Sequence, residues 1–230
     1  DKIQPVIDDA KDGDTVVVIG GEYPYDVTID GKDIKFKKPF GDEVTINGDV
    51  FLKNLDNHFE LKGFTILGDT TSNTESLGIE NCSDVIISNV ISKRVDIEES
   101  NVYIIDSEMV KLGIYQTKSE VKVIRSKIED TLHIDGGSSN GHVFFQNEIN
   151  SITSGSKSNQ KIIFSYNKIT KAHLGIRGKV IAVGNIFDGS NNSIHAAFRW
   201  DMSNAECYLE FSNNIIRHFK ISGANLGGIG

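Results

Sequence analysis

The chain has 230 residues, with 24 Lys and Arg against 32 Asp and Glu, and therefore a formal net charge of −8. This acidic balance disfavours nucleic acid as a partner, because phosphate binding leaves a basic patch. No apolar run approaches the roughly 20 residues of a membrane span, so a membrane is not an expected partner either. With 22 Gly, only 3 Pro and many Ile, Val, Asn and Ser residues, the composition favours strands and turns over helices.

The first segment, DKIQPVIDDAKDGDTVVVIGGEY, predicts a helix followed by a strand. Four apolar residues fall on one helical face, the pattern breaks at Gly13, and strand alternation begins at Thr15; the four are Ile3, Val6, Ile7 and Ala10. We expect residues 1–13 to form an amphipathic cap over one end of the core, as the terminal units of repeat proteins require. Residues 15–80 repeat less regularly.

From about residue 89 onward, a sequence pattern recurs in which a small polar residue precedes a large apolar residue by two positions. The small polar residues are Asn89, Ser107, Ser126, Asn147, Asn167, Asn185 and Asn214, at intervals of 18, 19, 21, 20, 18 and 29. The apolar residues two positions later are Ile91, Met109, Ile128, Ile149, Ile169, Phe187 and Ile216. A nearly constant period of this length is typical of solenoid proteins.

Apolar residues alternate on both sides of each small polar residue. The preceding pairs include Val102/Ile104, Val121/Val123, Ile162/Phe164, Val180/Ala182 and Leu209/Phe211, and the following pairs include Val95/Ile97, Leu112/Ile114, Leu132/Ile134, Leu174/Ile176 and Phe219/Ile221. Period-two alternation predicts strands with one buried face. A unit this short has no room for a crossover helix, so its strands must stack in parallel on the next unit. We therefore predict an all-β fold, a parallel β-helix (β-solenoid) in one domain over 1–230, with coils over 14–222 and a tail over 223–230.

The column of small polar residues predicts a hydrogen-bonded ladder. Successive coils spaced by about 4.8 Å bring equivalent amides into register, where each can bond the next. Asn167 is accordingly expected to be structural. The two cysteines, Cys82 and Cys207, lie about six coils apart, on the order of 29 Å, which is too far for a disulfide. Both are expected to be free, buried packing residues.

Because the inward positions form the core, function is expected on the outward positions. The residue after the second inward position reads Glu80, Glu98, Tyr115, Asp135, Gly155, Arg177 and Arg199 along the coils. The residue between the two inward positions reads Gly78, Asp96, Gly113, His133, Thr153, Gly175 and His195. One outer face thus changes from acidic to basic and carries two histidines.

These columns allow a functional and a plain interpretation. Asp135, Glu98 and Glu80 could hold Ca²⁺, since carboxylates on adjacent coils approach the geometry of an oxygen cage, or they could form an ordinary solvated face. His133 and Asp135 could be a surface pair. Arg177 lies two coils from Asp135, about 10 Å away, so both could line one groove.

The interval of 29 residues, NIFDGSNNSIHAAFRWDMSNAECYLEFSNN, inserts roughly nine residues between regular coils of about 20 and holds the single Trp of the chain. Long insertions in solenoids often form the wall of a binding site. Trp200, beside Arg199 and near His195, could stack on a sugar ring, or it could cover core where the coil is distorted. Tyr115 is a further candidate for substrate binding.

The N-terminal segment, the repeated N-x-I turns and the coil period resemble the pectin-lyase-like superfamily of right-handed parallel β-helices over nearly the whole chain. That resemblance implies a right-handed coil and leaves the activity open, because this architecture hosts lyases, hydrolases, esterases, epimerases, tailspikes and adhesins. It also implies a secreted or cell-surface protein that acts on or binds a polysaccharide.

Within this superfamily, HLGIRGKVIAVGNIFDGS is similar to the coil that carries the catalytic Arg of polysaccharide lyase family six, the alginate lyases and chondroitinase B. The resemblance places that Arg at Arg177. The family has a Lys base one coil earlier, where this chain has Gly155, with Lys157 two positions away. The pectate lyase pattern Arg-x-Pro-x-x-Arg is absent around SIHAAFRW.

The first functional hypothesis is β-elimination on a uronate-containing polysaccharide. Arg177 and Arg199 would neutralise the carboxylate, and His133 or Lys171 would remove the C5 proton. His195, Trp200 and Tyr115 would bind the substrate, and Ca²⁺ would be a possible cofactor.

Two alternatives stay open. The first is hydrolysis by paired carboxylates, in which Asp96 and Glu98 would act with Asp135. The second is a module without catalysis that binds carbohydrate, as in an adhesin or a tailspike. The sequence leaves the particular polysaccharide and the oligomeric state open.

Overall fold

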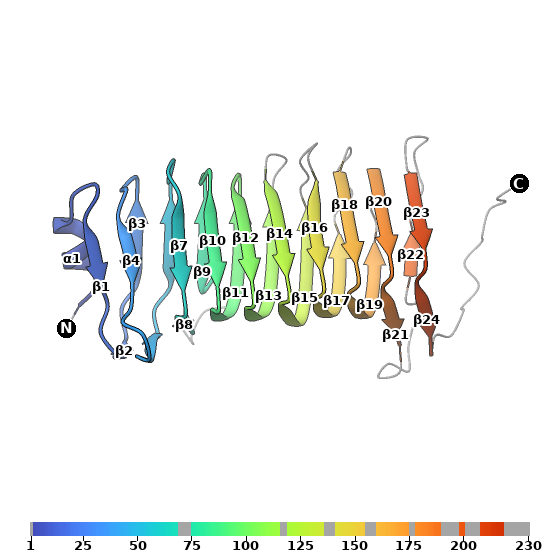
Figure 1. Ribbon diagram of the computed structural model, residues 1–230, viewed down its shortest axis with the longest axis horizontal. Helices are drawn as coiled ribbons and strands as arrows, with labels where there is room; N and C mark the ends of the chain where they lie inside the picture. Colours follow the sequence, from blue (N-terminus) through green and yellow to red (C-terminus); the bar gives the residue numbers. More distant parts are fainter. Residues whose placement is uncertain are drawn as a thin grey trace, which may run out of the picture.

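A computed structural model describes residues 2–68, 75–115, 119–135, 141–154, 160–174, 178–189, 198–200 and 208–218. It confirms the predicted fold class, since the strands stack in parallel into a β-solenoid (Figure 1). Cys207, Gly155, Arg177 and His195 lie outside the described residues, as does the predicted tail. Among the described residues, no helix is both long enough and apolar enough to cross a membrane.

One wall of the solenoid is an eight-stranded sheet. Its strands are β7 (Phe59–Lys62), β10 (Val85–Ser88), β12 (Asn101–Ile105), β14 (Glu120–Ile124), β16 (His142–Phe145), β18 (Gln160–Ser165), β20 (Gly178–Val183) and β23 (Tyr208–Ser212). Neighbouring strands pair in parallel without slipping, with Val102 opposite Val121 and Ile104 opposite Val123. Figure 1 shows them side by side along the long axis of the molecule.

The other walls belong to a 14-stranded sheet. It contains β2 (Gly21–Tyr23), β3 (Val27–Asp30), β5 (Val44–Ile46), β6 (Val50–Lys53), β8 (Thr65–Ile66), β9 (Leu77–Glu80), β11 (Ile91–Glu98), β13 (Glu108–Tyr115), β15 (Lys127–Asp135), β17 (Glu148–Ser154), β19 (Lys168–Leu174), β21 (Ile186–Asp188), β22 (Phe198–Trp200) and β24 (Ile215–Arg217). A separate two-stranded sheet pairs β1 (Thr15–Val17) with β4 (Lys35–Lys37). The inward residues of all walls form one continuous hydrophobic core.

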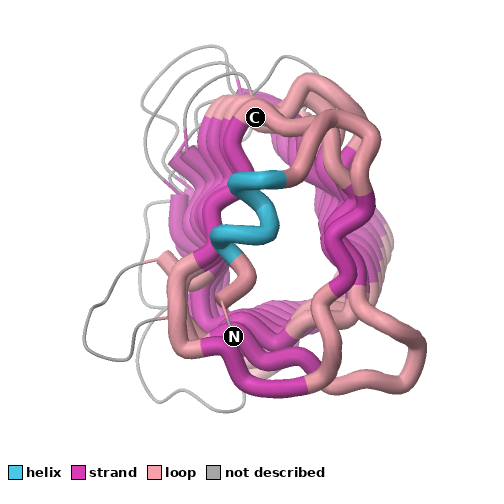
Figure 2. The backbone as a smooth tube through the Cα atoms, turned by 90° about the vertical axis from the view of Figure 1, so that its left-hand side faces the viewer, coloured by secondary structure: helices cyan, strands magenta, loops and turns pink. Residues whose placement is uncertain are grey.

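The helical cap exists but is shorter than predicted. Helix α1 spans Gln4–Asp9 and lies across the end of the coil stack (Figure 2). Ile3 and Ile7 are buried as expected, whereas Val6 is 54% exposed, because a helix of six residues turns only one narrow side toward the core. Lys32 Nζ binds the carbonyls of Ile7 and Asp8, each at 2.6 Å, and so ties the end of the helix to the coil beneath.

The predicted amide ladder is confirmed from Asn147 onward. The Nδ2 group of each Asn donates to Oδ1 of the next, at 3.0, 3.0 and 2.9 Å, through Asn147, Asn167, Asn185 and Asn214. Each Nδ2 also donates to a strand carbonyl of a neighbouring coil, such as Phe144 for Asn167. Asn167 is therefore structural. We call this set the amide ladder.

Serine residues continue the same spine toward the N-terminus. Ser107 N donates to Ser126 Oγ at 3.1 Å, and Val90 N donates to Ser107 Oγ at 3.1 Å. The ladder position in that coil is thus Val90, and the assignment of Asn89 was wrong by one residue. Asn89 instead takes the left-handed turn position, with φ of 51°, which Asn tolerates well. We call Ser107 and Ser126 the serine ladder.

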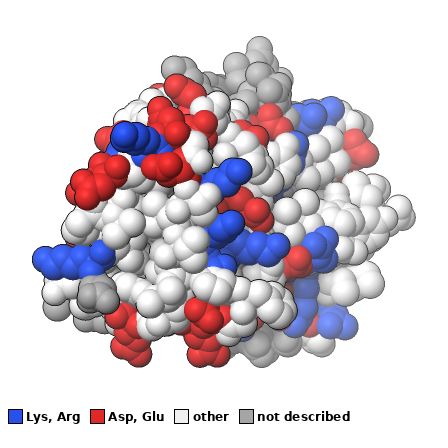
Figure 3. Space-filling model, turned by 60° about the vertical axis from the view of Figure 1, so that its left-hand side comes forward, with Lys and Arg blue, Asp and Glu red and all other residues white. Residues whose placement is uncertain are grey.

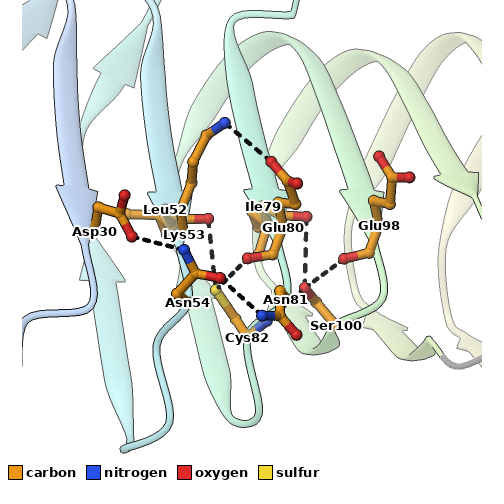
Figure 4. A network of polar contacts seen from close by, with 10 residues as sticks. All are labelled: Asp30, Leu52, Lys53, Asn54, Ile79, Glu80, Asn81, Cys82, Glu98 and Ser100. Atoms are coloured by element: carbon orange, nitrogen blue, oxygen red, sulfur yellow. Dashed lines mark hydrogen bonds and ion pairs between the residues drawn. The ribbon is translucent and has the colours of Figure 1, made fainter.

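Further polar contacts hold the turns near Cys82 (Figure 4). Cys82 is a buried, free cysteine, as predicted, and its backbone N–H donates to Ser100 Oγ at 2.9 Å. On the exposed side of these coils, Asn54 Nδ2 donates to Asp30 Oδ1 and Asn81 Nδ2 donates to Asn54 Oδ1, both at 2.7 Å. The N-terminal coils thus carry a separate ladder in contact with solvent, formed by Asp30, Asn54 and Asn81, and we call it the exposed ladder.

Candidate functional site

The structure brings several predicted site residues together on one outer face of the 14-stranded sheet. Strand pairing aligns Glu80 with Glu98, Glu98 with Tyr115, and Tyr115 with Asp135. This part of the first outward column is therefore confirmed.

The second outward column is confirmed through Thr153 and then differs from the prediction. Asp96 lies beside Gly113, Gly113 beside His133, and His133 beside Thr153. Thr153 pairs with His173, so the predicted neighbour Gly175 was wrong.

Arg199 also occupies a different column from the one predicted. It pairs with His173, which aligns it with His133 rather than with Glu80 and Asp135. The insertion before residue 198 changes the spacing, and spacing alone could not reveal the register. Trp200 pairs with Leu174, one position further along.

Lys171 lies in a third outward column of the same face. This column runs from Arg94 through Lys111, Thr131 and Ser151 to Lys171, which is exposed on β19. Lys171 pairs directly with Ser151. It thus belongs to the same face as His133 but to a different column and a later coil.

The predicted calcium ligands do not form a metal centre by themselves. Across the part of the chain that the structure describes, no group of three or more His, Cys, Asp or Glu side chains is placed to hold a metal ion. Glu80 is engaged by Lys53, whose Nζ lies 2.9 Å from Glu80 Oε2. Ca²⁺ therefore stays a prediction of the sequence.

A compact group of ionisable residues stands at the N-terminal part of this face, and we call it the Asp96 cluster. Its members are Glu75, Arg94, Asp96, Tyr115 and His133. Arg94 Nε lies 2.8 Å from Asp96 Oδ2, and Arg94 Nη2 donates to the Tyr115 hydroxyl at 3.3 Å. The guanidinium group therefore links an acid and a phenol on adjacent coils.

Gly113 makes this arrangement possible. It lies between Asp96 and His133 in the second column, and a Cβ at this position would be only 2.6 Å from the Tyr115 hydroxyl and would also collide with Asp96 Oδ1. The absent side chain leaves the space into which the carboxyl and the phenol extend. Any other residue would push them apart.

Burial dominates the electrostatics of the cluster. The Asp96 side chain is 6% exposed, and its carboxyl group contacts the Arg94 guanidinium and the Tyr115 hydroxyl. Burial raises the pKa of Asp96 above its ordinary value, and the nearby Arg94 only partly opposes this. Burial also raises the pKa of Glu75, helped by the negative charge of Asp96.

Tyr115 and His133 extend the cluster to the next coil. Burial and the Asp96 charge raise the pKa of Tyr115, so its hydroxyl keeps its proton at neutral pH. The Tyr115 and His133 rings lie 5.7 Å apart between centroids. His133 Nδ1 is 3.0 Å from Thr153 Oγ1. This hydrogen bond uses Nδ1 and orients the imidazole. Nε2 is the ring nitrogen that this bond does not use.

Sequence reasoning named Tyr115, His133 and Asp96 but missed Arg94 and Glu75. Arg94 was detectable, because it stands two residues before Asp96 and therefore on the same side of one strand. Glu75 precedes β9, in a segment without clear alternation, and its proximity to Asp96 follows only from the coil stacking.

A cavity of about 110 Å³ lies near the N-terminus, where Asp12, Lys32, Asn54, His58 and neighbouring residues line it. No residue of the Asp96 cluster lines this cavity. On the molecular face drawn in Figure 3, acidic side chains lie among the basic ones and no continuous basic surface forms.

No family model matches the chain, and no curated protein and no solved structure matches it significantly. The parallel β-solenoid is thus established from the strand pairing itself. The resemblance to pectin-lyase-like proteins and to polysaccharide lyase family six stays a prediction.

Proposed function

We propose that the protein cleaves a uronate-containing polysaccharide by β-elimination, and that the Asp96 cluster forms the reactive part of the face. The observation that supports this is the approach of a guanidinium, a phenol and an imidazole on one outer face, in Arg94, Tyr115 and His133. These are the three kinds of group that such a reaction needs.

Each group has a distinct role in this proposal. Arg94, whose side chain is 33% exposed, neutralises the substrate carboxylate and so acidifies the C5 proton. His133 removes that proton, and the electron pair forms the C4–C5 double bond as the C4–O bond breaks. Tyr115 donates its proton to the departing oxygen. The raised pKa of Tyr115 suits the role of acid because it keeps the phenol protonated.

Asp96 holds Arg94 in place, because Arg94 Nε lies 2.8 Å from Asp96 Oδ2 on the same strand. The sequence had assigned the neutralising role to Arg177 and Arg199 and named Lys171 as an alternative base. Lys171 and Arg199 belong to later coils of the same sheet, where they are candidates for binding further sugars, and Arg177 lies outside the described residues.

The test is an assay for unsaturated uronate products by their ultraviolet absorbance on alginate, pectate and glycosaminoglycans, with and without Ca²⁺. We expect Tyr115→Phe and His133→Ala to lower kcat by about 10²-fold or more. Arg94→Lys should lower kcat/KM, because an ammonium group cannot reproduce the guanidinium geometry. Lys35→Ala serves as the control, because Lys35 is exposed on β4 and far in the sequence from the Asp96 cluster. Absence of product on every substrate would refute the proposal.

A second candidate function is carbohydrate binding without turnover. The observation that favours it is that the cavity described above is lined by residues near the N-terminus and by no member of the Asp96 cluster. Binding of one of these polysaccharides that is weakened by Arg94→Ala, with no product formed, would support this alternative. Secretion and a cell-surface location remain expectations that accompany either function.

A further inference from the structure

The outer face of the eight-stranded sheet carries an apolar surface that the proposed function does not use. Outward positions of β12 to β20 hold mostly aliphatic and aromatic side chains in two neighbouring columns, one of which contains Lys122 and the other Ser165. Six of them are Ile105, Ile124, Val143, Phe145, Ile163 and Ile181. We call this set the apolar face. All are partly exposed, whereas their strand neighbours Ile104, Val123, Phe144 and Ile162 are buried in the core.

The outward positions of the 14-stranded sheet are different. In β11 to β17, the three outward columns between Arg94 and Thr153 contain charged, hydroxyl, imidazole, phenol and glycine residues and no aliphatic side chain. Exposed side chains of a solenoid wall are thus not generally apolar in this protein. Contiguous apolar surface on one wall marks a contact site.

The rim of the apolar face has the character of an interface. Tyr166 is 62% exposed and packs edge-on against Phe145, with ring centroids 5.9 Å apart. Lys122, the charged residue within the columns, directs its Nζ to the Tyr103 hydroxyl at 2.8 Å and to Glu120 at 3.2 Å. Its aliphatic stem can therefore remain on the sheet while its charge points to the edge.

Charges along one edge of this face are arranged with opposite signs at its two ends. In the column that precedes the apolar positions, Glu120 stands one coil before Gly141, and Lys161 stands one coil after it. One coil further out, Asn101 pairs with Glu120, and Lys179 pairs with Lys161. The edge is therefore acidic toward the N-terminus and basic toward the C-terminus.

We propose that the apolar face binds a second copy of this chain, with the two solenoids antiparallel and related by a twofold axis that lies between the copies, parallel to the strands, at β16. This operation places Phe145 against the partner's Phe145. It also places Glu120 against the partner's Lys161 at both ends of the interface. A twofold contact must be complementary to itself, and the opposite charges at equal distances from Gly141 fulfil that condition.

The size of the face determines the expected affinity. Five strands from β12 to β20 at about 4.8 Å, each about 16 Å long, give roughly 380 Å² per copy. Stable dimers bury about 800 Å² per partner. The dimer should therefore be reversible, with a Kd in the micromolar range. Flat sheets pack face to face about 10 Å apart, which suits the regular side-chain columns seen here.

Sedimentation velocity of the purified chain from about 1 to about 100 µM tests this proposal. We expect a shift from monomer to dimer across that range. Phe145→Glu should remove the dimer, because two carboxylates would meet at the twofold axis. Ser151→Glu, at a partly exposed outward position of the other sheet, is the matched control and should leave the dimer unchanged. Circular dichroism and thermal unfolding verify that both variants fold.

Exchanging the charges of Glu120 and Lys161 provides the decisive test. Glu120→Lys alone and Lys161→Glu alone should each weaken the dimer, whereas the double variant should restore it. A wild-type chain that stays monomeric at 100 µM, or a dimer that survives Phe145→Glu, would overturn the proposal. If the monomer persists and Phe145→Glu instead weakens polysaccharide binding, the face belongs to a glycan and the proposal is also refuted. Because these residues lie outside the Asp96 cluster, the outcome is independent of the lyase assay.

Discussion

The amide ladder and the serine ladder occupy the same buried turn but connect different numbers of coils. Asn167 accepts from Asn147 N on one side and donates to Asn185 Oδ1 on the other. Ser107 Oγ accepts from Val90 N and donates to Ile105 O of its own coil. An amide thus joins the coils on both sides of it, whereas a serine hydroxyl joins its own coil to one neighbour.

This difference divides the solenoid into two regions. Tyr115 and His133 lie on the strands that follow Ser107 and Ser126, and Arg94 and Asp96 lie on the strand that follows Val90, while the coils from β17 onward follow the amide ladder. Fewer connections at one turn lower the free energy of local opening there. We infer that the turn beside the candidate site opens more readily than the turn of the amide ladder, which suits a surface that must adjust to a polymer.

Breaking the amide ladder should have the largest effect. Asn167→Ala removes two donated bonds, to Phe144 O and Asn185 Oδ1, and leaves Asn147 N without its acceptor. Because the Asn167 side chain is buried, we expect the free energy of unfolding to fall by about 3 kcal/mol in urea denaturation. Asn54→Ala, in the exposed ladder, is the control and should cost less than about 1 kcal/mol. Equal losses would contradict the proposed importance of burial.

Breaking the serine ladder should cost less. Ser107→Ala removes the hydrogen bond to Ile105 O and the acceptor for Val90 N. We expect a loss of about 1 to 2 kcal/mol, together with faster amide hydrogen exchange in β11 and β13. Exchange in β18 and β20 should not change. A loss as large as that of Asn167→Ala would show that the two ladders are equivalent.

Replacing a residue of the serine ladder by asparagine tests the difference between the two ladders in the opposite direction, because it should add a connection between coils. Each Nδ2 of the amide ladder binds the carbonyl three residues before the preceding ladder position, as Asn147 binds Val123. At position 126, an asparagine would meet the carbonyl of Ile104 by the same rule. We expect Ser126→Asn to raise the free energy of unfolding by about 1 kcal/mol. A lower melting temperature would mean that the turn cannot accommodate the larger side chain.

The smallest expected effect concerns pH. Asp96 has a raised pKa in the folded chain, so the folded state holds this proton more tightly than the unfolded state does. Its contribution therefore lowers stability as the pH rises above the ordinary value of 3.8. Asp96→Asn removes this loss, so the variant should gain stability relative to wild type between about pH 4 and pH 7.

Asp106 provides a control of opposite sign. A hydrogen bond from Arg125 lowers the pKa of Asp106, so its contribution is present above 3.8 and is lost as the pH falls. Asp106→Asn should therefore lose stability relative to wild type at pH 7 and lose less at lower pH. If both variants responded to pH in the same direction, the assignment of the Asp96 pKa would be wrong. Melting temperatures across the pH range provide the measurement.

Much of the fold could be predicted because alternation and period are local properties of the chain. The ladder positions from Ser107 to Asn214 and the outward neighbours from Glu80 to Asp135 follow from counting residues. Counting failed at Asn89, because Asn suits both the ladder and the left-handed turn beside it. It failed again at Arg199, because an insertion can absorb residues on either side of a strand.

The Asp96 cluster illustrates what sequence cannot provide. Neither the burial of Asp96 nor the contact of Arg94 with Tyr115 follows from residue type, because both depend on three coils meeting at one place. The apolar face, by contrast, can be recognised in the sequence of β12 to β20, because both alternating series of residues in these strands are largely apolar.

Gly113 allows the geometry of the Asp96 cluster to be changed by a very small substitution. Gly113→Ala would add one methyl group and remove no functional group, yet it would displace both Asp96 and Tyr115. A loss of turnover in that variant could not be assigned to a missing acid, base or charge. It would instead measure how much of the reaction depends on spacing alone.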